Sequence, residues 1–234
     1  MPTKGQVRGA PRKGEVRAPA ALAVVVTGAL YVGLPNHLFV GPRFAIPALE
    51  MLLLVPLIAV NPTRMTRETR WSRVASLCLV LIVVVANLVT LELLVRAMVV
   101  DKSKDGQSLL LGAVEIWVTN VLAFALAYWE LDRGGPVSRT QVEPREELPP
   151  ADFRFSQDEN DDAVYEVAVG SSGKADWVPT FPDYLYVSIT NSTAFSPTDT
   201  MPLTHRAKGL MATQCIAALV VSLLVIARAV SVIQ

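Results

Sequence analysis

The chain has 234 residues, of which 52% are hydrophobic, and its mean hydropathy is +0.41, values typical of membrane proteins rather than water-soluble ones. The formal net charge is zero, but the first 18 residues carry five Lys or Arg against one Glu, whereas residues 130–180 carry twelve Asp or Glu against five Lys or Arg. The basic start has no interleaved aromatic residues, which argues against nucleic-acid binding and favours attraction to anionic lipid.

The first half of the chain reads as a basic tail followed by four membrane spans. Residues 1–17 contain Gly and Pro throughout and are expected to be disordered. Pro47 and Pro56 interrupt the second apolar stretch, so we expect that helix to be kinked. The four transmembrane helices are predicted at about 18–40, 44–60, 74–100 and 108–129.

The distribution of positive charge predicts the orientation of these spans. The loop at 61–73 holds four arginines and lies two spans after the basic tail, so both can face the cytoplasm. Because loops rich in Lys and Arg stay on the cytoplasmic side, a cytoplasmic N-terminus in the plasma membrane is expected. Five spans then place the acidic segment inside and Gln234 outside.

Residues 130–180 form an acidic segment that also contains Pro and Gly. Its middle, Ala163–Val169, favours one short strand, and the remainder looks solvated. A long stretch of this kind is usually a linker, a lid or a docking site, and we interpret it as an acidic linker or loop.

The last part of the chain, residues 181–234, has the outline of a re-entrant hairpin followed by a final span. Pro182–Thr190 is a short apolar helix with too few residues to cross a bilayer, which takes about 20. The polar run Asn191–Thr204 follows, and Gly209–Ile233 is again long enough to span. Non-helical backbone at membrane depth needs protein or water to satisfy its polar groups, and pore loops are the familiar case.

This stretch, from Tyr184 to Val232, resembles the pore hairpin of two-helix potassium-channel modules, and the order of spans is similar to uncharacterised bacterial integral-membrane families. An ungapped comparison places Thr193–Asp199 on the selectivity filter of those channels. The matching positions are Thr193, Asp199, Pro202, Ala207 and Lys208. The resemblance implies a homo-oligomer and a monovalent cation as the permeating species.

The residues that define potassium selectivity are different here. Ser196 and Thr198 replace both filter glycines, and Pro197 locks the backbone between them. A ladder of backbone carbonyls is therefore not expected. Side-chain oxygens would line such a loop instead, and a degenerate, weakly selective pore is the hypothesis. Asp199 also fits an ordinary turn aspartate that bonds neighbouring backbone N–H groups.

Polar and ionisable residues inside the predicted spans are functional candidates because hydrocarbon disfavours them. Glu92 lies four residues before Arg96, which favours an ion pair on one helix face. Glu50 and Glu115 have no obvious local partner, and interhelical hydrogen bonds from Asn87 or Gln214 are one possibility. The full set of intramembrane polar candidates is Glu50, Asn87, Glu92, Glu115, Asn120 and Gln214.

Other features place limits on the chemistry. Cys78 and Cys215 stand in apolar runs and are expected to be inert core thiols. The sequence shows no catalytic cluster, cofactor motif or metal-ligand spacing, so we expect neither an enzyme nor a bound cofactor. Tyr128 and Trp129 are typical of an interfacial aromatic anchor.

The fold expected is thus an all-α membrane protein with five transmembrane helices and a pore-loop-like hairpin before the last one. Its expected function is ion permeation or transport in the lipid bilayer. The alternative is a non-conducting scaffold or sensor that docks a partner through residues 130–180. One conflict stays open, since channel modules place the segment before the pore helix outside, whereas the positive charges here place it inside.

Overall fold

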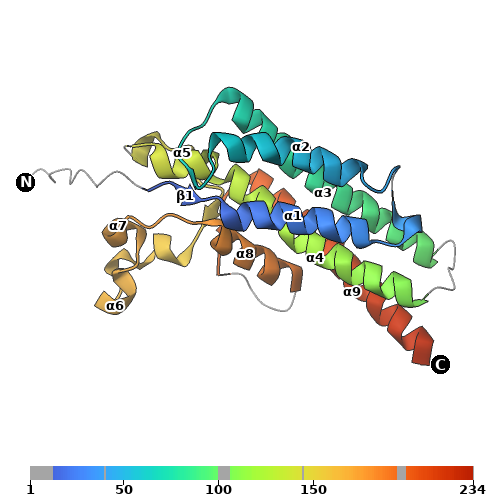
Figure 1. Ribbon diagram of the computed structural model, residues 1–234. Helices are drawn as coiled ribbons and strands as arrows, with labels where there is room; N and C mark the ends of the chain where they lie inside the picture. The colour runs from blue at the N-terminus through green and yellow to red at the C-terminus, as the bar shows by residue number, and fades with distance from the viewer. Residues whose placement is uncertain (1–12, 40, 100–105, 144, 194–198, 234) are drawn as a thin grey trace, which may run out of the picture.

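The computed structural model describes residues 13–39, 41–99, 106–143, 145–193 and 199–233, and it is mostly helical, at 76% (Figure 1). Its long helices lie roughly parallel or antiparallel to one another. The five longest are α1 (Ala18–Gly33), α2 (Ala45–Val60), α3 (Arg70–Val99), α4 (Gly106–Leu131) and α9 (His205–Ile233).

Three of these helices, α3, α4 and α9, are long and apolar enough to cross a membrane. Helices α1 and α2 are apolar but have 16 residues each. At 1.5 Å per residue they are about 24 Å long, against a hydrocarbon core of about 30 Å. The coarse expectation of a mostly helical chain with helices able to cross a membrane is therefore confirmed, whereas the number of spans is not decided by helix length.

The first helix is shorter than the predicted span 18–40. It ends at Gly33, and Leu34 takes an extended conformation with φ −56° and ψ 148°. The cause is Pro35, because the residue before a proline is disfavoured in the helical region. A short 3-10 turn, Asn36–Leu38, follows. Proline has no such effect in α2, which continues through Pro56 to Val60.

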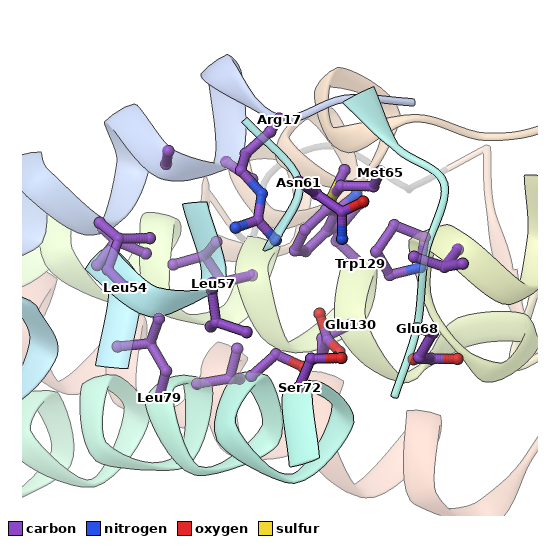
Figure 2. Close-up of a pocket in the computed structure, with 18 of the residues that line it drawn as sticks. Arg17, Leu54, Leu57, Asn61, Met65, Glu68, Ser72, Leu79, Trp129 and Glu130 are labelled. Atoms are coloured by element: carbon purple, nitrogen blue, oxygen red, sulfur yellow. The ribbon is translucent and has the colours of Figure 1, made fainter. Parts of the chain in front are cut away.

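Helix α4 lies at the centre of the molecule and packs against α1, α3, α8 (Phe181–Thr193) and α9. Helix α2 completes the arrangement by packing against α1 and α3. At one end, the helices α1–α4 enclose a pocket (Figure 2). The first four long helices therefore form a bundle, and α8 and α9 lie against it along α4.

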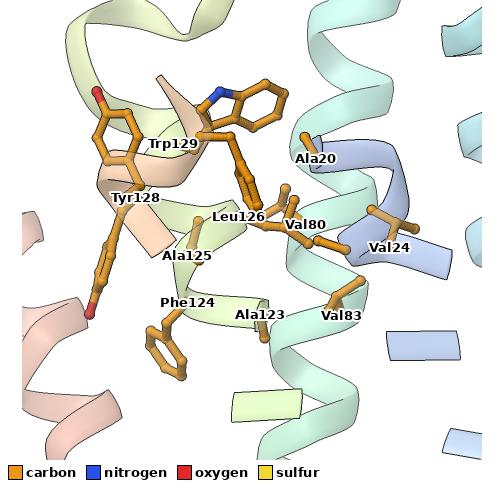
Figure 3. Packing of buried hydrophobic residues seen from close by; sticks show 14 of the residues in the cluster. Ala20, Val24, Val80, Val83, Ala123, Phe124, Ala125, Leu126, Tyr128 and Trp129 are labelled. Atoms are coloured by element: carbon orange, nitrogen blue, oxygen red, sulfur yellow. The ribbon is translucent and has the colours of Figure 1, made fainter. Parts of the chain in front are cut away.

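The second half of α4 is buried on all sides, as its sequence of apolar residues without a polar face requires. Figure 3 shows Ala123 and Leu126 of α4 close to Val83 of α3 and to Ala20 and Val24 of α1. Small alanines let the neighbouring helices approach closely, which is how membrane helices gain packing energy. Tyr128 and Trp129 belong to this core, so their prediction as interfacial anchors was wrong.

Residues 130–180 are folded against the end of the bundle, although we expected a linker. They contain α5 (Pro136–Gln141), β3 (Phe153–Arg154), α6 (Tyr165–Ala168) and α7 (Ser172–Ala175), with 3-10 turns between them. The predicted strand at 163–169 was wrong: α6 lies there, and its Val164, Tyr165 and Val167 are exposed. Without a partner strand, β-branched residues alone do not make a sheet.

Two short antiparallel pairs lie at this end of the bundle, where residues 130–180 form a cap. β1 (Glu15–Val16) pairs with β2 (Arg64–Met65). β3 pairs with β4 (Met201–Pro202), just before α9. The tail predicted to be disordered up to residue 17 thus ends in a paired strand, and its residues 1–12 lie outside the described part of the chain. α8 and α9 both begin at this end of the bundle (Figure 1).

Candidate functional site

The strongest candidate site lies inside the bundle, around Glu50 of α2. Its side chain is buried at 2% exposure, and Oε2 has no hydrogen-bond partner in the described part of the chain. A Cβ atom on Gly28 of α1 would lie 2.9 Å from this oxygen, so the absence of a side chain on α1 makes room for the carboxyl group. A buried, unpaired carboxyl group in a membrane helix is a functional candidate by default.

A small enclosed cavity of about 10 Å³ adjoins Glu50. This is close to the least space that one water molecule needs. Its polar lining comes from all four helices of the bundle. The polar side chains are Thr27, Tyr31, Glu50, Asn87, Thr90 and Thr119.

Asn87 lines this cavity and is hydrogen-bonded to α4. The Asn87 amide donates to the Ile116 carbonyl oxygen at 3.0 Å, and Asn120 Nδ2 donates to Asn87 Oδ1 at 3.1 Å. Asn120 Oδ1 is buried and has no partner among the described residues. Asn87, a sequence candidate for a hydrogen bond to a glutamate, bonds α4 instead, which offers it a backbone carbonyl and a second amide.

The threonine hydroxyl groups around the cavity donate within their own helices. Thr27 donates to the Val24 carbonyl at 2.7 Å, and Thr90 donates to the Ala86 carbonyl at 2.7 Å. Each hydroxyl hydrogen is therefore in use, while the oxygen keeps lone pairs for another donor. The cavity consequently presents acceptor oxygens to whatever occupies it.

Glu115 of α4 lies next to this cavity but in a second, open recess of about 450 Å³. The recess also contains Asn36 and Arg43 near the far end of α1, and Leu34 lines both spaces. Glu115 Oε2 is buried without a partner in the described structure, and a Cβ on Gly33 would lie 2.9 Å from Oε1. The carboxyl groups of Glu50 and Glu115 thus each lie beside a glycine of α1, and these two glycines are five residues apart in the sequence.

Two other sequence candidates lie elsewhere. Glu92 and Arg96 form the predicted ion pair, but on an exposed helix face, with side chains 51% and 67% exposed. Gln214 of α9 is fully buried against α8 and α4, so its predicted bond to a glutamate was also wrong. The groups that it contacts are Tyr128, Ser188, Asn191 and Ser192.

The residues predicted to form the pore loop are only partly described. Thr193 ends α8 and donates to the Thr190 carbonyl, and Asp199 is exposed. Ser196, Pro197 and Thr198 lie outside the described residues. Among the described residues of α8, Ser188, Asn191 and Ser192 bond to α4 or α9. The expectation that Cys78 and Cys215 are core thiols was wrong: Cys78 is exposed and Cys215 half-buried.

A buried ionic network between the cap and the bundle was missed from the sequence. Arg139 of α5 is fully buried, and its Nη2 lies 3.0 Å from Glu15 Oε2. Burial works to lower the pKa of Arg139, but the surrounding anionic groups, Glu15 and Asp132 among them, raise it above the ordinary value. Asp132 accepts hydrogen bonds from Tyr184 and from the Asp152 backbone.

The same network holds the start of α9. Asp152 is buried and receives the Arg206 guanidinium group at two oxygens. No signal in the sequence could indicate these pairings, because the partners are separated by 20 to 124 positions and each pair has at least one member in a segment with the composition of a linker.

In the described part of the chain, no group of three or more His, Cys, Asp or Glu residues is placed to hold a metal ion. In comparisons with protein families, curated proteins and solved structures, nothing matches this chain.

Proposed function

We propose that this chain is a multi-pass membrane protein that transports a monovalent cation, and that the cation is the proton. The observation that carries the proposal is the unpaired, buried carboxyl group of Glu50 beside a cavity that has room for one water molecule. Glu115, in the adjoining recess, is the group that exchanges protons with the solution at the far end of the bundle.

The size of the inner cavity favours the proton over a hydrated metal ion. A space of about 10 Å³ cannot hold an ion with its water shell, whereas a single water beside the Glu50 carboxyl group and the hydroxyl oxygens is enough to pass a proton. The weakly selective pore expected at the hairpin is replaced in this proposal by a relay inside the bundle.

The proposed membrane arrangement has five spans. α1 and α2 are short but pack against the longer helices, and a thinner local bilayer accommodates short spans at modest cost. α8 enters part of the way and α9 crosses completely. The cap and the start of α1 face the cytoplasm in this proposal, because β1 pairs with the arginine-rich 61–73 loop and loops rich in Lys and Arg stay on the cytoplasmic side.

The test is proton flux into liposomes that contain the purified protein, measured with an internal pH-sensitive dye under an imposed membrane potential. We expect flux in the wild type and a reduction of roughly a hundredfold for Glu50→Gln, because an amide cannot give up and regain a proton. Glu115→Gln should also reduce the rate. Glu92→Gln is the matched control, since Glu92 lies on an exposed face.

Two results would contradict the proposal. One is a wild-type flux no greater than that of liposomes without protein. The other is an unchanged rate in Glu50→Gln when the variant elutes as a single species in detergent.

A docking protein is the second candidate, supported by one feature of the cap. Val164, Tyr165 and Val167 of α6 are exposed and stand among acidic residues. Exposed apolar side chains of this kind often mark an interaction site. The absence of proton flux in the experiment above would favour this candidate.

A further inference from the structure

The bundle contains a second built site, at the end that the cap covers. A pocket of about 60 Å³ lies between the start of α1, the end of α2, the start of α3 and the end of α4 (Figure 2). Its inner wall is aliphatic and includes Leu54, Leu57, Leu79 and Val80. Cavities with such walls stay dry and accept apolar guests.

Arg17, directly before α1, supplies a cation to this pocket. Its Nε and Nη1 atoms are buried and have no hydrogen-bond partner among the described residues. In Figure 2 its guanidinium group points into the pocket toward Leu57. Burial lowers the pKa of Arg17, while Glu130 acts in the opposite direction, and the arginine keeps its charge at neutral pH.

Two acidic residues, Glu68 and Glu130, also line the pocket and are already engaged by another arginine. Glu130 Oε1 lies 2.5 Å from Arg73 Nη1 and also accepts a hydrogen bond from Ser76. Arg73 is 3.7 Å from Glu68 as well. Arg17 is therefore left without an ion pair in the described structure, and an anion bound in the pocket would balance its charge.

We infer that this pocket binds an anionic amphiphile with a single alkyl chain, whose carboxylate or phosphate group meets Arg17 and whose chain enters the aliphatic interior. Arg17 lies one residue before α1, and Glu130 lies one residue before the end of α4. If these helices cross the membrane, the pocket lies at the surface level of the bilayer, where such amphiphiles are found. The inference is independent of proton transport by Glu50.

The lining of the pocket also argues against simpler occupants. Water alone could accept a hydrogen bond from the Nε–H of Arg17, but it would leave the guanidinium charge without a counter-ion and would face the aliphatic inner wall. A free phosphate ion would pair with Arg17 but would leave the inner cavity empty. An alkyl chain with an acidic head group suits both parts of the pocket. The head group makes a charge-assisted hydrogen bond with Arg17, and the chain buries apolar surface against the inner wall.

The test uses Trp129, which lines the pocket, as a fluorescent reporter. Bromoundecanoate, a fatty acid with a quenching bromine atom, is titrated into the protein in phosphatidylcholine nanodiscs. We expect saturable quenching that decanoate or decyl phosphate reverses and decyltrimethylammonium does not. The more effective of the two anionic competitors distinguishes a fatty-acid carboxylate from a lipid phosphate.

Variants connect the quenching to the pocket. Arg17→Gln should weaken binding by at least about tenfold, because the charge-assisted hydrogen bond is lost. This variant should fold, since the Arg17 side chain has no hydrogen bond to lose within the described structure. Ala21→Leu, which narrows the pocket, should also reduce quenching. Arg70→Gln is the matched control, since Arg70 is exposed at the same end and does not line the pocket.

Three results would overturn the inference. They are quenching that rises linearly without saturation, equal affinity in Arg17→Gln and the wild type, and equal competition by the cationic amphiphile.

Discussion

The same type of side chain has a different role at each depth of the bundle. Glu50 is buried and unpaired, Glu92 is paired on an exposed face, and Glu130 is buried in contact with Arg73. The difference lies in the partner that tertiary packing supplies. A buried carboxyl group with an arginine partner is part of the scaffold, whereas one without a partner is available for chemistry.

Arg139 is the residue whose loss should destabilise the fold most. Replacement by Met leaves Glu15 buried without its cation, and we expect a loss of roughly 3–5 kcal/mol in the free energy of unfolding. The measurement is thermal or denaturant unfolding of the detergent-solubilised protein. Arg154→Met is the matched control, because its ion pair with Glu159 is exposed and should be worth at most about 1 kcal/mol.

A double variant distinguishes the loss of the Glu15–Arg139 ion pair from the loss of packing by the Arg139 side chain. Glu15→Gln combined with Arg139→Met should recover part of the stability, because it removes the unpaired buried charge. A double variant that is as unstable as the sum of both single ones would contradict the role of this ion pair.

At the scale of elements, apolar length predicted α3, α4 and α9 well, because a long apolar stretch has few alternatives in a bilayer. The end of α1 and the short helix α6 were not predicted. In the first case one proline outweighed the apolar composition after it. In the second, residues typical of strands had no partner strand and formed a helical turn in the cap.

The contact of α8 with α9 depends on Gln214. Its amide donates to Ser188 and Ser192, and its oxygen accepts from Tyr128 and Asn191. Gln214→Leu should lower stability by about 1–3 kcal/mol for each polar group left unpaired. Unfolding in detergent measures the loss. The neighbouring exposed Thr213, changed to Val, is the control, and an equal effect of both changes would show that the network contributes nothing.

At the scale of the whole molecule, the cap and the buried ionic network that joins it to the starts of α1 and α9 lie at one end of the bundle. β3 pairs with β4, and Arg206 binds Asp152, so the segment 130–180 is tied to the start of α9. The start of α1 is tied to the same place through Glu15. These contacts place the N-terminal end of α1, the cap and the beginning of α9 at one end of the bundle.

The sidedness of this face can be measured with one added cysteine. Ser156 is exposed in the cap, so Ser156→Cys should accept an impermeant thiol reagent once the reagent reaches it. We expect labelling only after the membrane of intact cells is breached, as a cytoplasmic cap requires. Cys78 and Cys215 are changed to Ser first, because neither is fully buried. Labelling from outside would reverse the proposed orientation.

The sequence by itself predicted a mostly helical chain and the positions of the three helices that are long and apolar enough to cross a membrane. These follow from length and hydropathy, which act locally along the chain. Tertiary structure alone decided that Glu50 Oε2 has no partner among the described residues, that Asn87 bonds Asn120, and that the acidic segment is a folded cap. The reason is physical: the role of a buried polar group depends on which neighbour is within hydrogen-bond reach, and those neighbours come from distant parts of the chain.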